Sequence, residues 1–154
     1  MSWVPWLLFL HILGAVIAFG PGFAFAFFGA AAGREPQHAN FTLRTTKFIA
    51  DRMVTPLAIF QGVTGVGLIL AEGIDLLNAK WLLVAIVLYA AALYIAIGLN
   101  LPNLRRLIEL TSAPPGPGGP PPELIARAAR GRQYGVAMGG LVAVIVFLMV
   151  VKPF

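Results

Sequence analysis

The chain has no cysteine, only two histidines and few charged residues. Without cysteine it cannot form a disulfide, a thiolate metal site, an iron–sulfur cluster or a cysteine nucleophile. Charged residues make up 11% of the 154 residues, whereas a soluble domain typically carries about 25%. Hydrophobic residues account for 59%, and the mean hydropathy is +0.87. This composition argues against a water-soluble fold.

Four apolar stretches are long enough to cross about 30 Å of hydrocarbon as helices, which takes about 20 residues each. They cover about residues 3–32, 53–71, 81–101 and 134–151. None alternates between polar and apolar residues, so helices are favoured over a barrel. The first stretch is too long for a signal peptide and has no basic start, so we expect a permanent helix. We predict an all-α fold, a four-helix transmembrane bundle that forms one domain over residues 1–154.

Positive charge is concentrated in two alternate loops. These loops hold nine of the eleven basic residues: Arg34, Arg44, Lys47, Arg52, Arg105, Arg106, Arg127, Arg130 and Arg132. The loop between the second and third stretches carries Glu72 and Asp75 instead. By the positive-inside rule, the basic loops are cytoplasmic and both termini are non-cytoplasmic. The net charge of +5 thus reports membrane orientation, and we expect a multi-pass protein of the inner membrane, with the lipid bilayer and no nucleic acid as partner.

Prolines and glycines mark two irregular segments. Residues 113–122 are almost entirely proline and glycine, which predicts a flexible linker. Residues 123–132 after it are amphipathic, and we expect their arginines to lie along the inner leaflet. Asp51 and Arg52 precede Thr55-Pro56, a pattern typical of a helix start. The alternative for Asp51 and Arg52 is a proton or anion site.

The first stretch carries a histidine, His11, on a face of small residues. Ala15, Ala18, Gly22 and Gly29 follow it at helical spacing, while Phe19, Phe23 and Phe27 form a separate bulky ridge. A small-residue face lets other helices approach closely. Pro21 lacks an amide donor, so we expect a kink there.

Polar side chains in three stretches share one predicted depth. At 1.5 Å per residue, His11, Gln61 and Tyr89 all lie roughly 12 to 15 Å below the outer surface. Each is costly if it faces lipid, so we expect them to converge on one interior point, joined by Thr64.

His11 has two interpretations. As neutral imidazole it is a candidate axial metal ligand for a tetrapyrrole such as haem b, with Gln61 and Tyr89 lining the site. Alternatively, it bonds Gln61, Tyr89 or a carbonyl and holds the helices together. A bis-histidine site has no second intramembrane histidine available, since His38 lies in a loop. Met149 is a conceivable thioether partner, and a five-coordinate site is also conceivable.

Glycine pairs occur on two stretches, Gly62 with Gly65, and Gly135 with Gly139, which Gly140 extends. Spacing of this kind is typical of close helix packing. We expect both pairs to pack within the bundle.

Several motifs together resemble one family. They are residues 11–15 (HILGA), 51–56 (DRMVTP), 62–65 (GVTG), 80–82 (KWL) and 148–153 (LMVVKP). They resemble DUF2269, a bacterial family of integral membrane proteins of unknown function, over almost the whole chain. The resemblance implies a four-helix membrane topology and no particular activity.

A more distant resemblance is to the HemJ-type protoporphyrinogen oxidases, which also have a histidine-bearing first helix and a Val-Lys-Pro-Phe-like tail. It would imply haem and protoporphyrinogen chemistry, with His11 as the haem contact. The chain departs from that pattern at Ala85, where those enzymes have lysine, and it lacks their further histidines.

Two functions are therefore open. The first is a structural or accessory subunit, a non-enzymatic bundle that packs as a homo-oligomer or within a larger membrane complex through its glycine faces. The second is a haem b-binding redox protein related to the HemJ-type enzymes.

Overall fold

The computed structural model describes residues 3–113 and 118–153, and every element in these ranges is helical. The elements are α1 (Val4–Arg34), η1 (Pro36–His38), α2 (Ala39–Ile49), η2 (Ala50–Val54), α3 (Thr55–Glu72), α4 (Lys80–Leu93), η3 (Tyr94–Asn100), α5 (Leu101–Leu110) and α6 (Pro122–Val151). They form four long, apolar helices of membrane-spanning length. The predicted all-α, four-helix bundle is confirmed.

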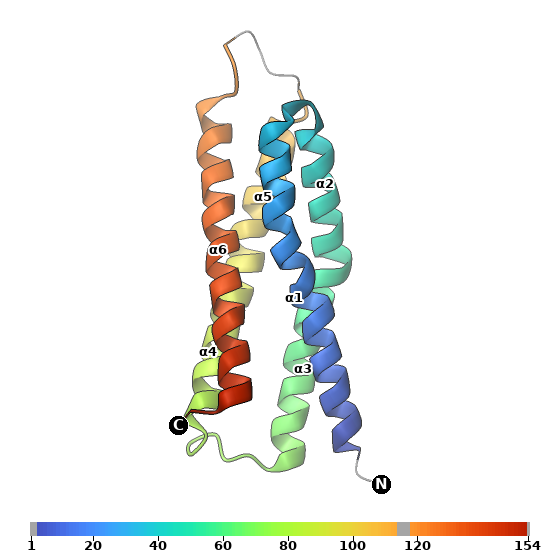
Figure 1. Ribbon diagram of the computed structural model, residues 1–154, viewed down its shortest axis with the longest axis vertical. Helices are drawn as coiled ribbons and strands as arrows, with labels where there is room; N and C mark the ends of the chain where they lie inside the picture. The colour runs from blue at the N-terminus through green and yellow to red at the C-terminus, as the bar shows by residue number, and fades with distance from the viewer. Residues whose placement is uncertain (1–2, 114–117, 154) are drawn as a thin grey trace.

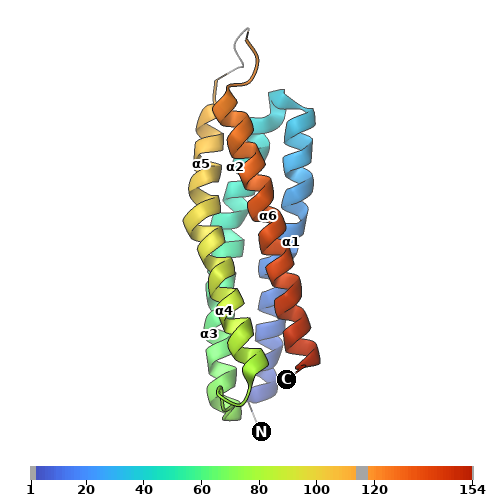
Figure 2. The same cartoon turned by 90° about the vertical axis from the view of Figure 1, so that its left-hand side faces the viewer.

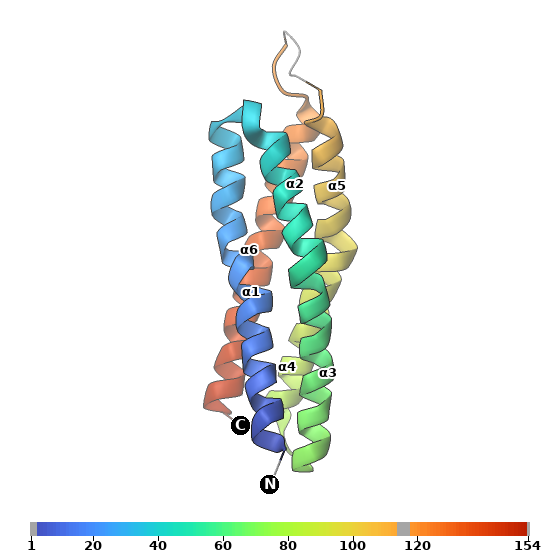
Figure 3. The same ribbon diagram turned by 90° about the vertical axis from the view of Figure 1, so that its right-hand side faces the viewer.

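Two of the four long helices are built from several elements. Pro36–Glu72 comprises η1, α2, η2 and α3, and Lys80–Leu110 comprises α4, η3 and α5. Figure 3 shows α2 continuing into α3, and Figure 2 shows α4 continuing into α5. The helices thus extend past the apolar stretches, because amphipathic turns continue them at the basic end.

The predicted helix start at Asp51 and Arg52 is wrong, because both residues lie inside the continuous helix Pro36–Glu72. They belong to η2, a π-helical turn that ends two residues before Pro56. The other π-helical segment, η3, likewise ends two residues before Pro102. A proline ring clashes with the carbonyl four residues earlier, and that residue lies in the π turn in both cases. A wider π turn is one way for a helix to continue through a proline.

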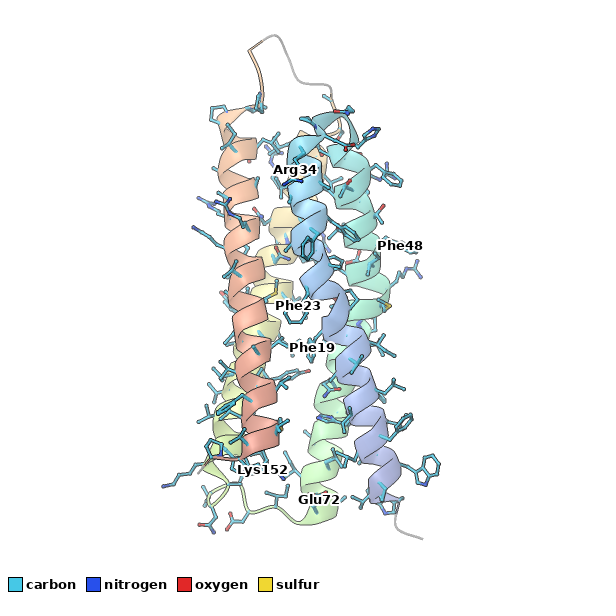
Figure 4. All side chains as sticks on the ribbon, in the orientation of Figure 1. Phe19, Phe23, Arg34, Phe48, Glu72 and Lys152 are labelled. Carbon is cyan, nitrogen blue, oxygen red and sulfur yellow. The ribbon has the colours of Figure 1, made fainter. Side chains whose placement is uncertain are left out.

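Some helices pack against each other more extensively than others. α1 packs chiefly on α3, and α4 packs chiefly on α6. α1 continues through Pro21, and Figure 1 shows its N-terminal half leaning away from α6. Phe19 and Phe23 of α1 point into the space between α1 and α6 (Figure 4). The bundle therefore contains two closely packed helix pairs, α1 with α3 and α4 with α6, and the two pairs also contact each other at the basic end, where Asn40 of α2 donates to the Ile108 carbonyl of α5.

Both chain ends lie at the same end of the bundle as the loop between α3 and α4 (Figure 1). Here the Lys152 Nζ lies 5.3 Å from the ring centroid of Trp81, a cation–π contact. The C-terminus of α6 is thereby joined to the start of α4. We call this end the Trp81 end, and the opposite end, which carries η1, α2, α5 and the start of α6, the basic end.

Ion pairs connect the helices at the basic end. Arg106 of α5 donates to both carboxylate oxygens of Glu123 at 3.0 Å, and Arg127 donates to Glu123 at 2.8 Å. Glu123 lies outside the apolar stretch of α6, and the two guanidinium groups lower the pKa of its carboxyl to about 2. The predicted amphipathic segment 123–132 is confirmed as the first turns of α6. Of the predicted linker 113–122, residues 114–117 lie outside the described residues.

Candidate functional site

The candidate site lies between α1 and α3, where His11 meets Gln61 and Thr64. His11 Nδ1 is 2.9 Å from Thr64 Oγ1, and His11 Nε2 is 2.9 Å from Gln61 Nε2. Gln61 and Thr64 are buried, with 7% and 4% of their surface exposed, and His11 is half-buried. Of the four side chains expected to converge, His11, Gln61 and Thr64 therefore meet in the structure. We call these residues the polar trio.

The hydrogen-bond directions within the polar trio follow from its donors and acceptors. The Thr64 hydroxyl lies 3.0 Å from the Phe60 carbonyl oxygen and 3.1 Å from that of Gln61, both of which only accept. The hydroxyl therefore donates to the backbone and accepts from His11 Nδ1–H. That tautomer leaves a lone pair on His11 Nε2, which accepts from the amide of Gln61. Both nitrogens of a neutral imidazole are then bonded to α3.

Glycines give the polar trio its space. A Cβ atom at Gly65 would lie 3.2 Å from His11 Cε1, and one at Gly14 would lie 3.0 Å from Gln61 Oε1. Gln61 Oε1 is buried and has no hydrogen-bond partner among the described residues. The missing side chain of Gly14 leaves the space that this oxygen occupies. Gly14 was not among the predicted site residues, although it lies one turn from His11 on the same helix face.

Tyr89 lies beside the polar trio but does not join it. Its hydroxyl donates to the backbone carbonyl of Ala58. A Cβ atom at Gly62 would lie 3.0 Å from that hydroxyl oxygen. Tyr89 therefore connects α4 to a different face of α3, and the expectation that it meets His11 at one point is wrong. The depth estimate was adequate, but the direction of each side chain around α3 decides its partner.

The predicted small-residue face of α1 is only partly packed. Ala18 is fully buried, whereas a Cβ atom at Gly22 or Gly29 would meet nothing within 4 Å. The helices at the basic end are therefore less closely packed against this part of α1 than the small-residue face predicts.

The two glycine pairs differ. Gly62 and Gly65 pack within the bundle as predicted, against Tyr89 and His11. At Gly135 and Gly140 of α6 a Cβ atom would meet nothing within 4 Å, and at Gly139 it would make ordinary contact with Phe23. The prediction that the α6 glycines pack closely within the bundle is wrong for Gly135 and Gly140, which have open space beside them, whereas Gly139 faces Phe23 of α1.

An apolar groove that includes Gly140 runs between α6 and the helix formed by α4 and η3. Its volume is about 460 Å³. It is lined by Leu88, Ala91, Ile95, Val136, Ala137, Gly140, Leu141 and Val144. The small residues Ala91, Ala137 and Gly140 give it the shape of a helix-packing surface. We call it the α4–α6 groove.

The chain matches one family of known sequences. Residues 5–153 match DUF2269, described as a predicted integral membrane protein. The chain belongs to this family. No curated protein and no solved structure matches this DUF2269 member. Its membership, like the four apolar helices, makes it a multi-pass integral membrane protein.

The polar trio does not fit a haem in this arrangement. Axial ligation needs a free lone pair on an imidazole nitrogen, but His11 Nε2 accepts from Gln61 and His11 Nδ1 donates to Thr64. Iron could bind only after Gln61 withdrew from His11. Within residues 3–113 and 118–153 there is also no cluster of three histidine, aspartate or glutamate side chains that would hold a metal ion.

Proposed function

We propose that this DUF2269 protein is a structural or accessory subunit that packs against a transmembrane helix of another subunit in the inner membrane. The observation that carries the proposal is the α4–α6 groove. Small residues line it, and the chain places nothing over Gly140. In lipid, small-residue faces favour helix association because two backbones can approach closely. A second copy of this chain and a different protein are the two possible sources of the helix.

The polar trio supports the same function. Its groups bond one another and the backbone of α3, so they stabilise the pairing of α1 with α3. A rigid α1–α3 pair would leave the α4–α6 pair to present the groove. We infer that His11 stabilises helix packing and does not bind a cofactor.

The absence of cysteine makes the test direct. We would introduce Ala137→Cys in the groove and attach a benzophenone maleimide, which on illumination reacts with any nearby C–H group. The matched control is Val63→Cys on α3, which is 64% exposed and lies outside the groove. We expect Ala137→Cys to yield a covalent adduct with a protein in native membranes and Val63→Cys to yield no protein adduct. The mass of the adduct distinguishes a second copy from another subunit.

The proposal fails if the two labelled variants give the same products, or if the wild-type protein in mild detergent has the mass of one chain and Ala137→Cys gives no adduct. Gly140→Leu, which fills the groove, should abolish the adduct.

The haem alternative has its own test. We expect the protein purified from cells supplied with haem to show no Soret band, because Gln61 occupies His11 Nε2. A Soret band that His11→Ala abolishes would support the haem b redox function instead. Gln61→Ala would then raise haem occupancy by freeing the nitrogen.

The proposed orientation, with both termini non-cytoplasmic, can be tested in the same cysteine-free background. Asn78→Cys lies in the loop at the Trp81 end and Glu35→Cys at the basic end. A membrane-impermeant maleimide added to spheroplasts should label Asn78→Cys alone. Labelling of Glu35→Cys alone would reverse the orientation.

A further inference from the structure

The outer face of the helix Pro36–Glu72 changes character along its length. Towards the basic end its exposed side chains alternate between aromatic and basic. They are Phe41, Arg44, Phe48 and Arg52. Further along, in α3, the most exposed large side chains are aliphatic: Ile59, Val63, Val66 and Leu70. The first group suits the headgroup region of a bilayer, and the second group suits its hydrocarbon.

Two exposed phenylalanines flank Arg44. Phe41 is 73% exposed and Phe48 is 65% exposed, which is costly for large apolar rings in water. With Asn40, Arg44 and Thr45 they line an open pocket of about 480 Å³. The Asn40 amide is already engaged, because it donates to the Ile108 carbonyl and to Thr111 Oγ1. Arg44 and Thr45 therefore supply the polar groups that the pocket offers to a ligand.

Arg44 has no acidic partner among residues 3–113 and 118–153, where the ion pairs at the basic end involve other groups. Asp51, the acid nearest to it on the same helix, pairs with Lys47. Glu109 and Glu123 pair with arginines of α5 and α6. A guanidinium group flanked by two apolar rings and left without a carboxylate is suited to an anion that carries an apolar chain.

We propose that this face binds an anionic phospholipid. Its phosphate accepts hydrogen bonds from the Arg44 guanidinium between Phe41 and Phe48, and Arg52 contacts the same headgroup. The acyl chains then extend along the aliphatic side chains of α3, from Ile59 to Leu70. These two residues are eleven apart, which is roughly 16 Å along a helix, and one leaflet of hydrocarbon is about 15 Å thick. The apolar face is thus long enough to cover the chains.

Native mass spectrometry of the intact protein in mild detergent tests the proposal. The probes are phosphatidylglycerol and phosphatidylcholine, which differ in net charge, and glycerol 3-phosphate, which has no acyl chains. We expect the wild type to retain phosphatidylglycerol in preference to phosphatidylcholine and to bind no glycerol 3-phosphate. Arg44→Gln should lower phosphatidylglycerol occupancy about fivefold, the effect expected for one basic side chain near an anionic surface. Phe48→Ala should lower the occupancy of both phospholipids.

The matched control is Arg132→Gln, which removes the same charge from α6, on the opposite side of the bundle from α2 (Figure 3). It should leave phosphatidylglycerol occupancy unchanged. Equal losses in Arg44→Gln and Arg132→Gln would mean that only net charge matters, and no loss in Arg44→Gln would mean that the site lies elsewhere. Either result overturns the proposal. Tight binding of glycerol 3-phosphate would also overturn it, because a soluble phosphate ester would then be the ligand.

Discussion

Glycine has opposite roles in the two helix pairs of this bundle. Between α1 and α3, Gly14 and Gly65 lie so close to polar side chains that a methyl group at either position would come within 3.0 to 3.2 Å of them. On α6, a Cβ atom at Gly135 or Gly140 would meet nothing within 4 Å. The comparison shows that one residue type creates an internal polar contact in the first pair and an outward surface in the second. Four experiments test the contacts within and between the helix pairs, in order of decreasing expected effect.

Gly65→Val should destabilise the protein by about 2 to 3 kcal/mol, because it overpacks the contact with His11. Gly140→Val adds the same side chain to the α4–α6 groove and should change the free energy of unfolding little. Both can be measured by SDS titration of the protein in mixed micelles. Similar losses in the two variants would remove the distinction between the helix pairs.

His11 and Gln61 should be energetically coupled. A double-mutant cycle with His11→Ala and Gln61→Leu should give a coupling of about 0.6 kcal/mol, with an upper bound of about 1.7 kcal/mol for hydrogen bonds between membrane helices. The same unfolding measurement yields the cycle. Strict additivity of the two substitutions would contradict the hydrogen bond between them.

Tyr89→Phe should cost about 0.6 kcal/mol or less. The substitution removes the hydrogen bond to the Ala58 carbonyl, which joins α4 to α3, and leaves the ring in place against Gly62. The comparison variant Tyr94→Phe alters a hydroxyl on a side chain that is 65% exposed. A loss in Tyr94→Phe as large as that in Tyr89→Phe would contradict a specific role for the bond between the pairs.

Glu123→Gln should have the smallest effect, and one that depends on pH. The pKa of Glu123 is about 2 in the folded protein against an ordinary value of 4.5. The carboxylate therefore stabilises the fold fully above about pH 4.5 and progressively less as the pH falls towards 2. Because the group is partly exposed, the contribution is small. The difference in melting temperature between wild type and Glu123→Gln should shrink from pH 6 to pH 3, and a constant difference would contradict the ion pairs.

The apolar stretches predicted the number of helices correctly, but they did not predict where the helices end or which way individual side chains point. Four apolar stretches were enough to predict four helices, because the cost of unsatisfied backbone groups in lipid leaves few alternatives. The ends of the helices were not predictable, because α2 and α5 are amphipathic turns that apolar content does not reveal. Pro56 looked like a helix start because the usual rule places proline in a first turn, and no sequence signal shows that a π turn precedes it.

Part of the polar trio was predictable from depth alone. His11, Gln61 and Thr64 lie at one level, and each needs a partner away from lipid. The depth of a residue in the membrane does not reveal in which direction its side chain points around the helix. The depth estimate therefore grouped Tyr89 with these residues, although the Tyr89 hydroxyl bonds the Ala58 carbonyl. The role of Gly14 depends on a contact across helices, which a single sequence does not show.

The π turn at Ala50–Val54 lets the helix Pro36–Glu72 hold one residue more than an ordinary α-helix of the same rotation. A π turn bonds each amide to the carbonyl five residues earlier, so the extra residue is absorbed locally. A chain that lost one residue there should return to the ordinary helical repeat, with Arg44 and Phe48 still on the outer face and Gln61 and Thr64 still beside His11. The chain can therefore change its length by one residue at this segment without changing what either half of the helix presents to its surroundings.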